Sequence, residues 1–233
     1  MTREPPTRRG FDADRANAVV QTLAILAAGA WAVYTFVYEA RIKPGLEPPA
    51  VSVETRLVRA GEHGSQVAIR STVTRRNVGQ TGVRILGLAY TVTGIRAQFR
   101  DEVPDAAFTA DLATAGRIAE ARGYTLAEPG TVILRQGLLF AGGAEGEAEP
   151  SDLNPGEAVA RDLIVYADRG RYDFVRFEVS LAYAKADEAP VRLRFTAAGD
   201  GRLGLAPRVD CRTDRAACDR LKTTDFATEF SLW

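Results

Sequence analysis

The feature that most constrains this chain is an uncharged, largely apolar run from Ala16 to Tyr38. A helix of about 20 apolar residues is long enough to cross the hydrocarbon core of a bilayer. Trp31, Tyr34 and Tyr38 lie in the C-terminal half of the run, and such rings gather at membrane–water interfaces. We therefore expect a transmembrane helix over residues 16–38, an interface belt at these three aromatics, and a short cytoplasmic tail at residues 1–15.

The same segment has features of an export signal. Residues 7–11, TRRGF, are similar to the twin-arginine signature, and Ala30-Trp31-Ala32 has the small-x-small form of a cleavage site. Two acidic residues just after the motif and an aromatic stretch beyond Ala32 favour an uncleaved anchor. A cleaved signal and a buried helix of a soluble protein remain alternatives. Anchor and signal both place the rest of the chain on the exported side.

Charges and small side chains refine this prediction. More Arg and Lys residues precede the run than follow it closely, which favours a cytoplasmic N-terminus and a periplasmic main domain. The predicted location is therefore the bacterial inner membrane, crossed once. Small side chains at Ala27, Ala28, Gly29 and Ala30 would let a neighbouring helix approach closely. The predicted partners are the lipid bilayer and other membrane protein subunits.

A proline-rich segment follows the apolar run. Residues 39–50 contain Pro44, Pro48 and Pro49, and proline-rich tethers are stiff and extended. Pro44 is expected to end the helix because a proline inside a helix lacks the backbone N–H group. We expect these residues to form a spacer between the membrane and the exported domain.

From residue 51 onward the apolar residues alternate with polar ones. The alternation is regular at residues 51–57, 67–74, 175–183 and 191–196, which predicts half-buried antiparallel strands. The less regular runs at 83–92, 131–140 and 158–166 are expected to be strands covered on both faces. Asn, Gly and Pro clusters at 75–82 and 153–157 predict turns. Short strands separated by turns predict a mainly β domain, an antiparallel β-sandwich over residues 51–233.

The order of these pieces resembles a known family. The strand, Asn-x-Gly turn and strand at Val73–Val83, with the Leu-x-Pro-Gly-Glu turn and strands at Leu153–Tyr183, are similar to bacterial immunoglobulin-like, cell-adhesion-related domains. The resemblance implies an immunoglobulin-like fold and no particular function. Between the two pieces, helical spacing of Phe108, Leu112 and Ala115 predicts a short helical insertion near residues 105–122.

The only cysteines are Cys211 and Cys218. An even count in an exported domain indicates a disulfide, here one that closes a small loop, although the sequence leaves open whether the two are bonded. Two thiols are too few for a zinc site, and the single histidine, His63, supplies no cluster. No metal or cofactor is expected.

The final segment carries the aromatic residues Phe226, Phe230 and Trp233. Exposed aromatics in such numbers are costly unless something covers them. One interpretation is that the segment packs back on its own sandwich or forms its last strand. The other is that it docks into a partner with Trp233 as the anchor.

Charge and motifs exclude some classes of function. Lys+Arg and Asp+Glu both number 30, so the net charge of +0 argues against nucleic-acid binding. The sequence has no phosphate-binding loop, dinucleotide fingerprint or zinc-protease motif, so an enzyme is not expected. We expect an accessory, structural or assembly subunit of a larger inner-membrane complex, whose sandwich contacts other proteins. The alternative is an exported module that binds a ligand or an envelope polymer.

Overall fold

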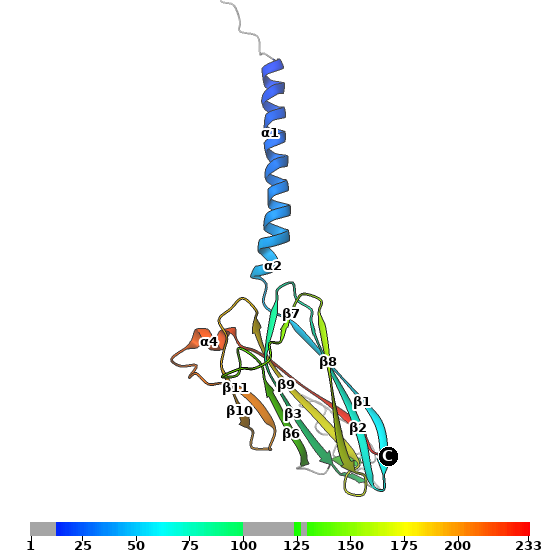
Figure 1. Cartoon of the computed structure of the whole chain (residues 1–233). Helices are drawn as coiled ribbons and strands as arrows, with labels where there is room; N and C mark the ends of the chain where they lie inside the picture. The colour runs from blue at the N-terminus through cyan, green and yellow to red at the C-terminus, as the bar shows by residue number, and fades with distance from the viewer. Residues whose placement is uncertain (1–12, 100–123, 127–129) are drawn as a thin grey trace, which may run out of the picture. The chain divides into compact units, whose positions relative to one another are not determined.

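In the computed structural model, the described residues are 13–99, 124–126 and 130–233. The predicted helical insertion near residues 105–122 lies outside them. The chain divides into two compact units, Met1–Glu47 and Pro48–Trp233, and each is described by itself below. The first is helical, whereas the second is mainly antiparallel β-sheet (Figure 1).

The first unit is one continuous helix with a change of pitch. It consists of α1 (Ala13–Val33), the π-helical segment η1 (Tyr34–Ile42) and α2 (Lys43–Leu46). The N–H of Lys43 donates to the carbonyl of Tyr38, five residues back. The prediction that Pro44 ends the helix is wrong, because the chain stays helical to Leu46. Pro44 is the second residue of α2, directly after the π-helical segment, and it removes one backbone donor there without ending the helix.

Two antiparallel sheets form the body of the second unit. The first sheet has the order β1-β2-β8, with β1 at Val51–His63, β2 at Gln66–Asn77 and β8 at Ala158–Asp168. The second sheet has the order β12-β9-β3-β6, with β12 at Lys222–Ser231, β9 at Phe174–Lys185, β3 at Val83–Ile95 and β6 at Thr131–Leu139. The short β7 (Asp152–Leu153) also pairs with β3.

Three smaller pieces complete the described chain. β4 (Ala97–Phe99) pairs with β5 (Tyr124–Leu126), and β10 (Leu193–Ala197) pairs with β11 (Leu203–Pro207). The short helix α4 (Arg215–Arg220) leads into β12.

The inner faces of the two sheets share one apolar core. Val67, Ile69 and Val165 of the first sheet belong to the same buried cluster as Leu88 and Phe177 of the second. Because side chains alternate along a strand, one face of each sheet turns inward and the other turns outward. Figure 1 shows the two groups of strands lying against each other. Mainly antiparallel sheets with a shared core are compatible with a β-sandwich.

A second apolar cluster lies on the outer face of the second sheet. A bulge between Ile85 and Gly87 turns Leu86 to this face, where it packs with Ala182 and Leu193. Leu193 begins the β10–β11 hairpin, so the hairpin covers this part of the sheet. Strand β3 is therefore buried on both sides, as its irregular apolar pattern predicted.

Three local predictions for the sheet domain are wrong. The runs at 131–140 and 158–166 were expected to be strands covered on both faces, yet β6 and β8 are edge strands. Residues 135–137 of β6 are exposed, and Ile164 and Tyr166 of β8 are 53% and 62% exposed. The apolar runs therefore predict correctly that these residues form strands, but they do not predict where the strands lie in the sheet. The turn expected at 75–82 begins later, since β2 continues to Asn77. The buried Asn77 amide donates to the carbonyls of Thr81 and Leu153, which fixes the start of the turn.

Candidate functional site

A groove of about 500 Å³ lies where the β10–β11 hairpin meets the outer face of the second sheet. Thr91 of β3, Ser180 of β9 and Asp225 of β12 line it from the sheet, while Thr196 and Arg202 line it from the hairpin. The register explains this convergence. Glu178 is paired with Thr91 and Ser180 with Asp225, so their polar side chains share the outer face.

Hydrogen bonds hold the hairpin in place beside the groove. The main-chain N–H of Leu203 donates to Thr91 Oγ1 at 2.8 Å. Arg202 Nε donates to Asp200 Oδ2 at 2.5 Å, and its guanidinium lies 3.8 Å from Glu178 Oε1. Arg202 therefore stands between two carboxylates, one on the hairpin and one on the sheet.

The charged groups of the groove influence each other's titration. Burial raises the pKa of Glu178, and the nearby guanidinium groups of Arg202 and Arg176 oppose that rise. Hydrogen bonds from Arg202 lower the pKa of Asp200, and the same pairing raises the pKa of Arg202. A carboxylate with a raised pKa beside an arginine is a feature often found at binding sites, and also in structural ion pairs.

A second hollow of about 270 Å³ adjoins the groove and shares Glu178 and Arg202 with it. Arg176, which lines this hollow, pairs with Glu229 at 2.7 Å. Together the two hollows present hydroxyl, carboxylate and guanidinium groups over a partly apolar floor. Their volumes lie near the range of small-molecule sites, about 300–1,000 Å³. Within residues 13–99, 124–126 and 130–233, no group of three or more His, Cys, Asp or Glu could hold a metal ion.

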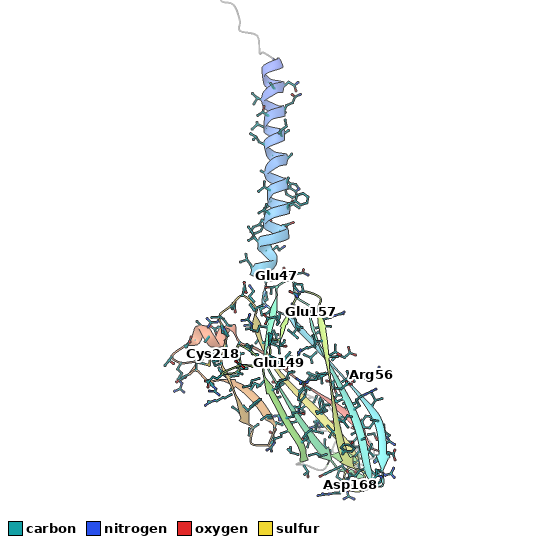
Figure 2. The ribbon with its side chains drawn as sticks, in the orientation of Figure 1. Glu47, Arg56, Glu149, Glu157, Asp168 and Cys218 are labelled. Atoms are coloured by element: carbon teal, nitrogen blue, oxygen red, sulfur yellow. A yellow bond between two sulfur atoms is a disulfide. The ribbon has the colours of Figure 1, made fainter. Side chains whose placement is uncertain are left out.

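Cys211 and Cys218 are joined by a disulfide, with their Cα atoms 5.7 Å apart. The bond closes the loop around α4, whose first turn is capped by Asp214 Oδ1 accepting from the N–H of Ala217 at 2.9 Å. Figure 2 shows Cys218 on α4, well separated from Arg56 on β1. The bond therefore braces the connection between β11 and β12.

The aromatic residues of the final segment lie in and just after a strand. Phe226 and Phe230 belong to β12 and pack against the core between the sheets. Trp233 is 65% exposed, and its indole N–H donates to Asp173 Oδ1 at 3.1 Å. In the structure this segment is thus the last strand of its own domain, with Trp233 at the surface.

Strand β1 also holds the final residues. The guanidinium of Arg59 donates to the main-chain oxygens of Leu232 and Trp233 at 3.1 and 2.9 Å. Leu232 is only 1% exposed, and its N–H donates to the carbonyl of Asp173. β1 is an edge strand of the first sheet and β12 is an edge strand of the second. The contacts of Arg59 therefore link these two edges.

The predicted membrane-facing residues form a ladder on the helical unit. The rings of Trp31 and Tyr34 have centroids 6.0 Å apart, and those of Tyr34 and Tyr38 stack at 5.3 Å. Their spacing of three and four residues places them on one side of the helix. The small residues Ala27, Ala28, Gly29 and Ala30 are exposed, and a Cβ at Gly29 would meet nothing within 4 Å.

Sequence reasoning missed the groove residues. The alternation along residues 175–183 predicted that Glu178 and Ser180 share a polar face, and this is correct. The alternation does not predict that the β10–β11 hairpin lies over this polar face. Arg202 follows a Gly-Asp-Gly turn, and nothing in its local sequence points to Glu178. The pairing becomes visible only when the hairpin is folded onto the sheet.

No family model matches the chain, and no curated protein does either. Some solved structures are similar over most of their length. One is a crystal structure of a Bordetella pertussis protein provisionally named ApaA, with 12% identity over 77% of this chain and 90% of that chain and a TM-score of 0.32. Another is an X-ray structure from a structural genomics consortium, with 11% identity, 76% and 84% coverage and a TM-score of 0.28.

A third is a crystal structure of a protein from Archaeoglobus fulgidus, with 10% identity over 80% of this chain and 98% of that chain and a TM-score of 0.22. The three TM-scores are low, so none of these structures carries an argument about fold or function.

Proposed function

We propose that this protein is a single-pass, membrane-anchored accessory, structural or assembly subunit of a larger bacterial inner-membrane complex. One observation carries the proposal. The helix over Ala16–Glu39 is long and apolar enough to cross a membrane, and none of its most apolar window is buried inside the chain. Such a surface requires lipid or the helices of other proteins to cover it.

The proposal includes a topology. The N-terminus is cytoplasmic, in line with the basic residues before the helix, and the sheet domain is periplasmic. The Cys211–Cys218 bond supports this location, because structural disulfides persist in oxidising compartments such as the periplasm. The helix stays attached as an anchor and is not removed as a signal.

We also assign the sheet domain to the immunoglobulin-like class. In that class one sheet contains strands A, B and E, and the other contains G, F, C and C′. The orders β1-β2-β8 and β12-β9-β3-β6 correspond to A-B-E and G-F-C-C′ when strands are lettered along the chain. This correspondence in order and antiparallel direction supports the assignment, which concerns the fold and implies no particular function.

Gentle-detergent extraction followed by native electrophoresis and mass spectrometry tests the proposal. We expect the protein to migrate within a larger assembly of defined partners, and its intact mass to include residues 7–39. Ala28→Leu or Gly29→Leu should reduce co-purification of these partners, whereas Ala18→Leu, which adds similar bulk near the start of the helix, should not. Migration of the wild-type protein as a lone monomer or dimer would refute a stable complex.

A second candidate function rests on the groove beside the β10–β11 hairpin. Its volume and its hydroxyl and carboxylate lining suit a hydroxyl-rich ligand such as an envelope polysaccharide. The test is co-sedimentation of the detergent-solubilised protein with insoluble peptidoglycan. Asp225→Asn should weaken the binding, while Asp162→Asn, on the other sheet, should not. Absence of wild-type co-sedimentation would remove peptidoglycan as the ligand.

A further inference from the structure

Two arginines share the inner-facing side of the first sheet by register, Arg75 buried and Arg161 exposed at the edge strand. Arg75 of β2 is only 8% exposed, and it is paired with Val159 of β8. Arg161, two residues further along β8, is paired with Val73. Arg75 and Arg161 are therefore diagonal neighbours on one face of the first sheet, within mutual reach of long side chains.

No carboxylate balances these charges on that face. The interior-facing positions of β2, β8, β3 and β6 carry no Asp or Glu. Asp162, next to Arg161, points to the opposite face, where it accepts from Thr72 at 2.6 Å. Since a buried charge is costly unless it is paired, Arg75 requires another explanation, and the exposed Arg161 adds a second positive charge beside it.

The contacts of Arg75 are with neutral groups. Its guanidinium donates to Ser151 Oγ at 3.0 Å and lies 5.0 Å from the centroid of the Phe140 ring. Its Nε is buried and has no hydrogen-bond partner in the described part of the chain. These contacts offset part of the desolvation cost and leave the positive charge in place, because a guanidinium does not lose its proton in proteins.

A small cavity lies next to these arginines, between the edge strands β8 and β6. It has a volume of about 60 Å³, enough for a few water-sized groups. Its polar lining residues are Tyr90, Arg161, Gln136 and Asp162, and the carboxylate of Asp162 is already engaged by Thr72. Gly137 and the aliphatic residues Val73, Leu138 and Leu163 complete the wall. Arg75 is not in its wall but is two residues from Val73 on the same face of β2.

Tyr90 supplies a second unused donor. The residue is 4% exposed, and its hydroxyl is buried without a hydrogen-bond partner among the described residues. Buried hydroxyl groups are nearly always paired, so an unpaired one that lines a cavity points to a missing acceptor. Burial raises the pKa of Tyr90 and lowers that of Arg75, and the charge of Arg161 lowers both, as expected for groups that share one site.

We propose that this cavity binds a carboxylate carried on a short aliphatic chain. The carboxylate accepts hydrogen bonds from the Tyr90 hydroxyl and the Arg161 guanidinium, and the buried charge of Arg75 lies behind it. The aliphatic part of the ligand packs on Val73, Leu138 and Leu163. Inorganic phosphate fits less well, because it would leave this apolar wall uncovered.

Thermal unfolding of the full chain in a non-ionic detergent tests the proposal, with sodium butyrate as the probe and ionic strength held constant with sodium chloride. At about ten times its fitted Kd, butyrate should raise Tm by about 3–6 °C. Arg161→Gln and Tyr90→Phe should each abolish most of this rise. Arg70→Gln removes an exposed arginine from the outer face of the same sheet, so it serves as the matched control and should keep the rise.

Three results would overturn the proposal. They are no rise in Tm with butyrate, a rise of equal size in the wild type and in both site variants, or an equal or larger rise with phosphate.

A second probe distinguishes the two possible sources of the carboxylate, a partner protein and a free small molecule. It is a blocked glutamate, with its main-chain amine and carboxyl capped. Tighter binding of the blocked glutamate than of butyrate would identify an acidic side chain of a partner protein. Tighter binding of butyrate would identify a free small carboxylate.

Discussion

Removing the disulfide is predicted to lower the free energy of unfolding by about 2.4 kcal/mol. Cys211 and Cys218 are seven residues apart, and the loop-closure relation gives roughly this value for so short a loop at 25 °C. The folded state should survive the change, because the Asp214 cap and the buried Ala217 still hold α4 in place. The loss therefore arises mainly from a less constrained unfolded chain.

The assay is thermal unfolding of the Cys211→Ser, Cys218→Ser double variant, which avoids a lone thiol. A loss of about 2.4 kcal/mol corresponds to a Tm lower by roughly 5–10 °C for a chain of this size. Wild-type protein treated with a reductant should shift to the same Tm, and the reductant should not change the double variant. A difference between wild type and variant of less than about 1 °C would refute the loop-closure argument.

Three further predictions concern single positions. Arg75→Met should leave the free energy of unfolding, measured in urea, within about 1 kcal/mol of wild type. Removing the charge removes its desolvation cost, which offsets the loss of the contacts with Ser151 and Phe140. A loss above about 3 kcal/mol would contradict this. Burial raises the pKa of Glu178 above 4.5, so its ionised form destabilises the fold above the folded-state pKa. Glu178→Gln should thus be the more stable protein near neutral pH, with the difference vanishing in a pH titration below 4.5. Gly143→Ala should lower Tm clearly, since a Cβ there would overlap the main-chain carbonyl of Leu86, whereas a Cβ at Gly199 meets nothing within 4 Å and Gly199→Ala should be close to neutral.

The parts of the fold that the sequence predicts well are those set by local pattern. Regular alternation over residues 67–74 and 175–183 follows directly from a strand with one buried face, and both segments are strands. The position of a strand within a sheet depends on partners far along the chain. This is why residues 158–166, apolar but at an edge, were placed wrongly.

The candidate sites divide in the same way. Extending the alternation of Val67, Ile69 and Val73 would have placed Arg75 inside the domain, so a signal for the buried arginine existed in the sequence. The Asn and Gly residues that follow indicated a turn there instead. The position of Arg161 beside Arg75 depends on the register of β8 against β2, and local sequence does not determine that register.

Arg59 of β1 donates to the main-chain oxygens of Leu232 and Trp233, so a strand made early is held by residues that are synthesised late. Strand β12 pairs with β9 over its whole length, so the second sheet lacks a strand until residues 222–231 have been synthesised. Most of the pairing joins segments far apart in sequence, such as β2 with β8 and β3 with β9, which makes folding slow. During synthesis, a nascent chain of this kind remains unfolded and open to aggregation until its last strand has been made. Its yield in the cell should therefore depend on chaperones that hold it in that interval.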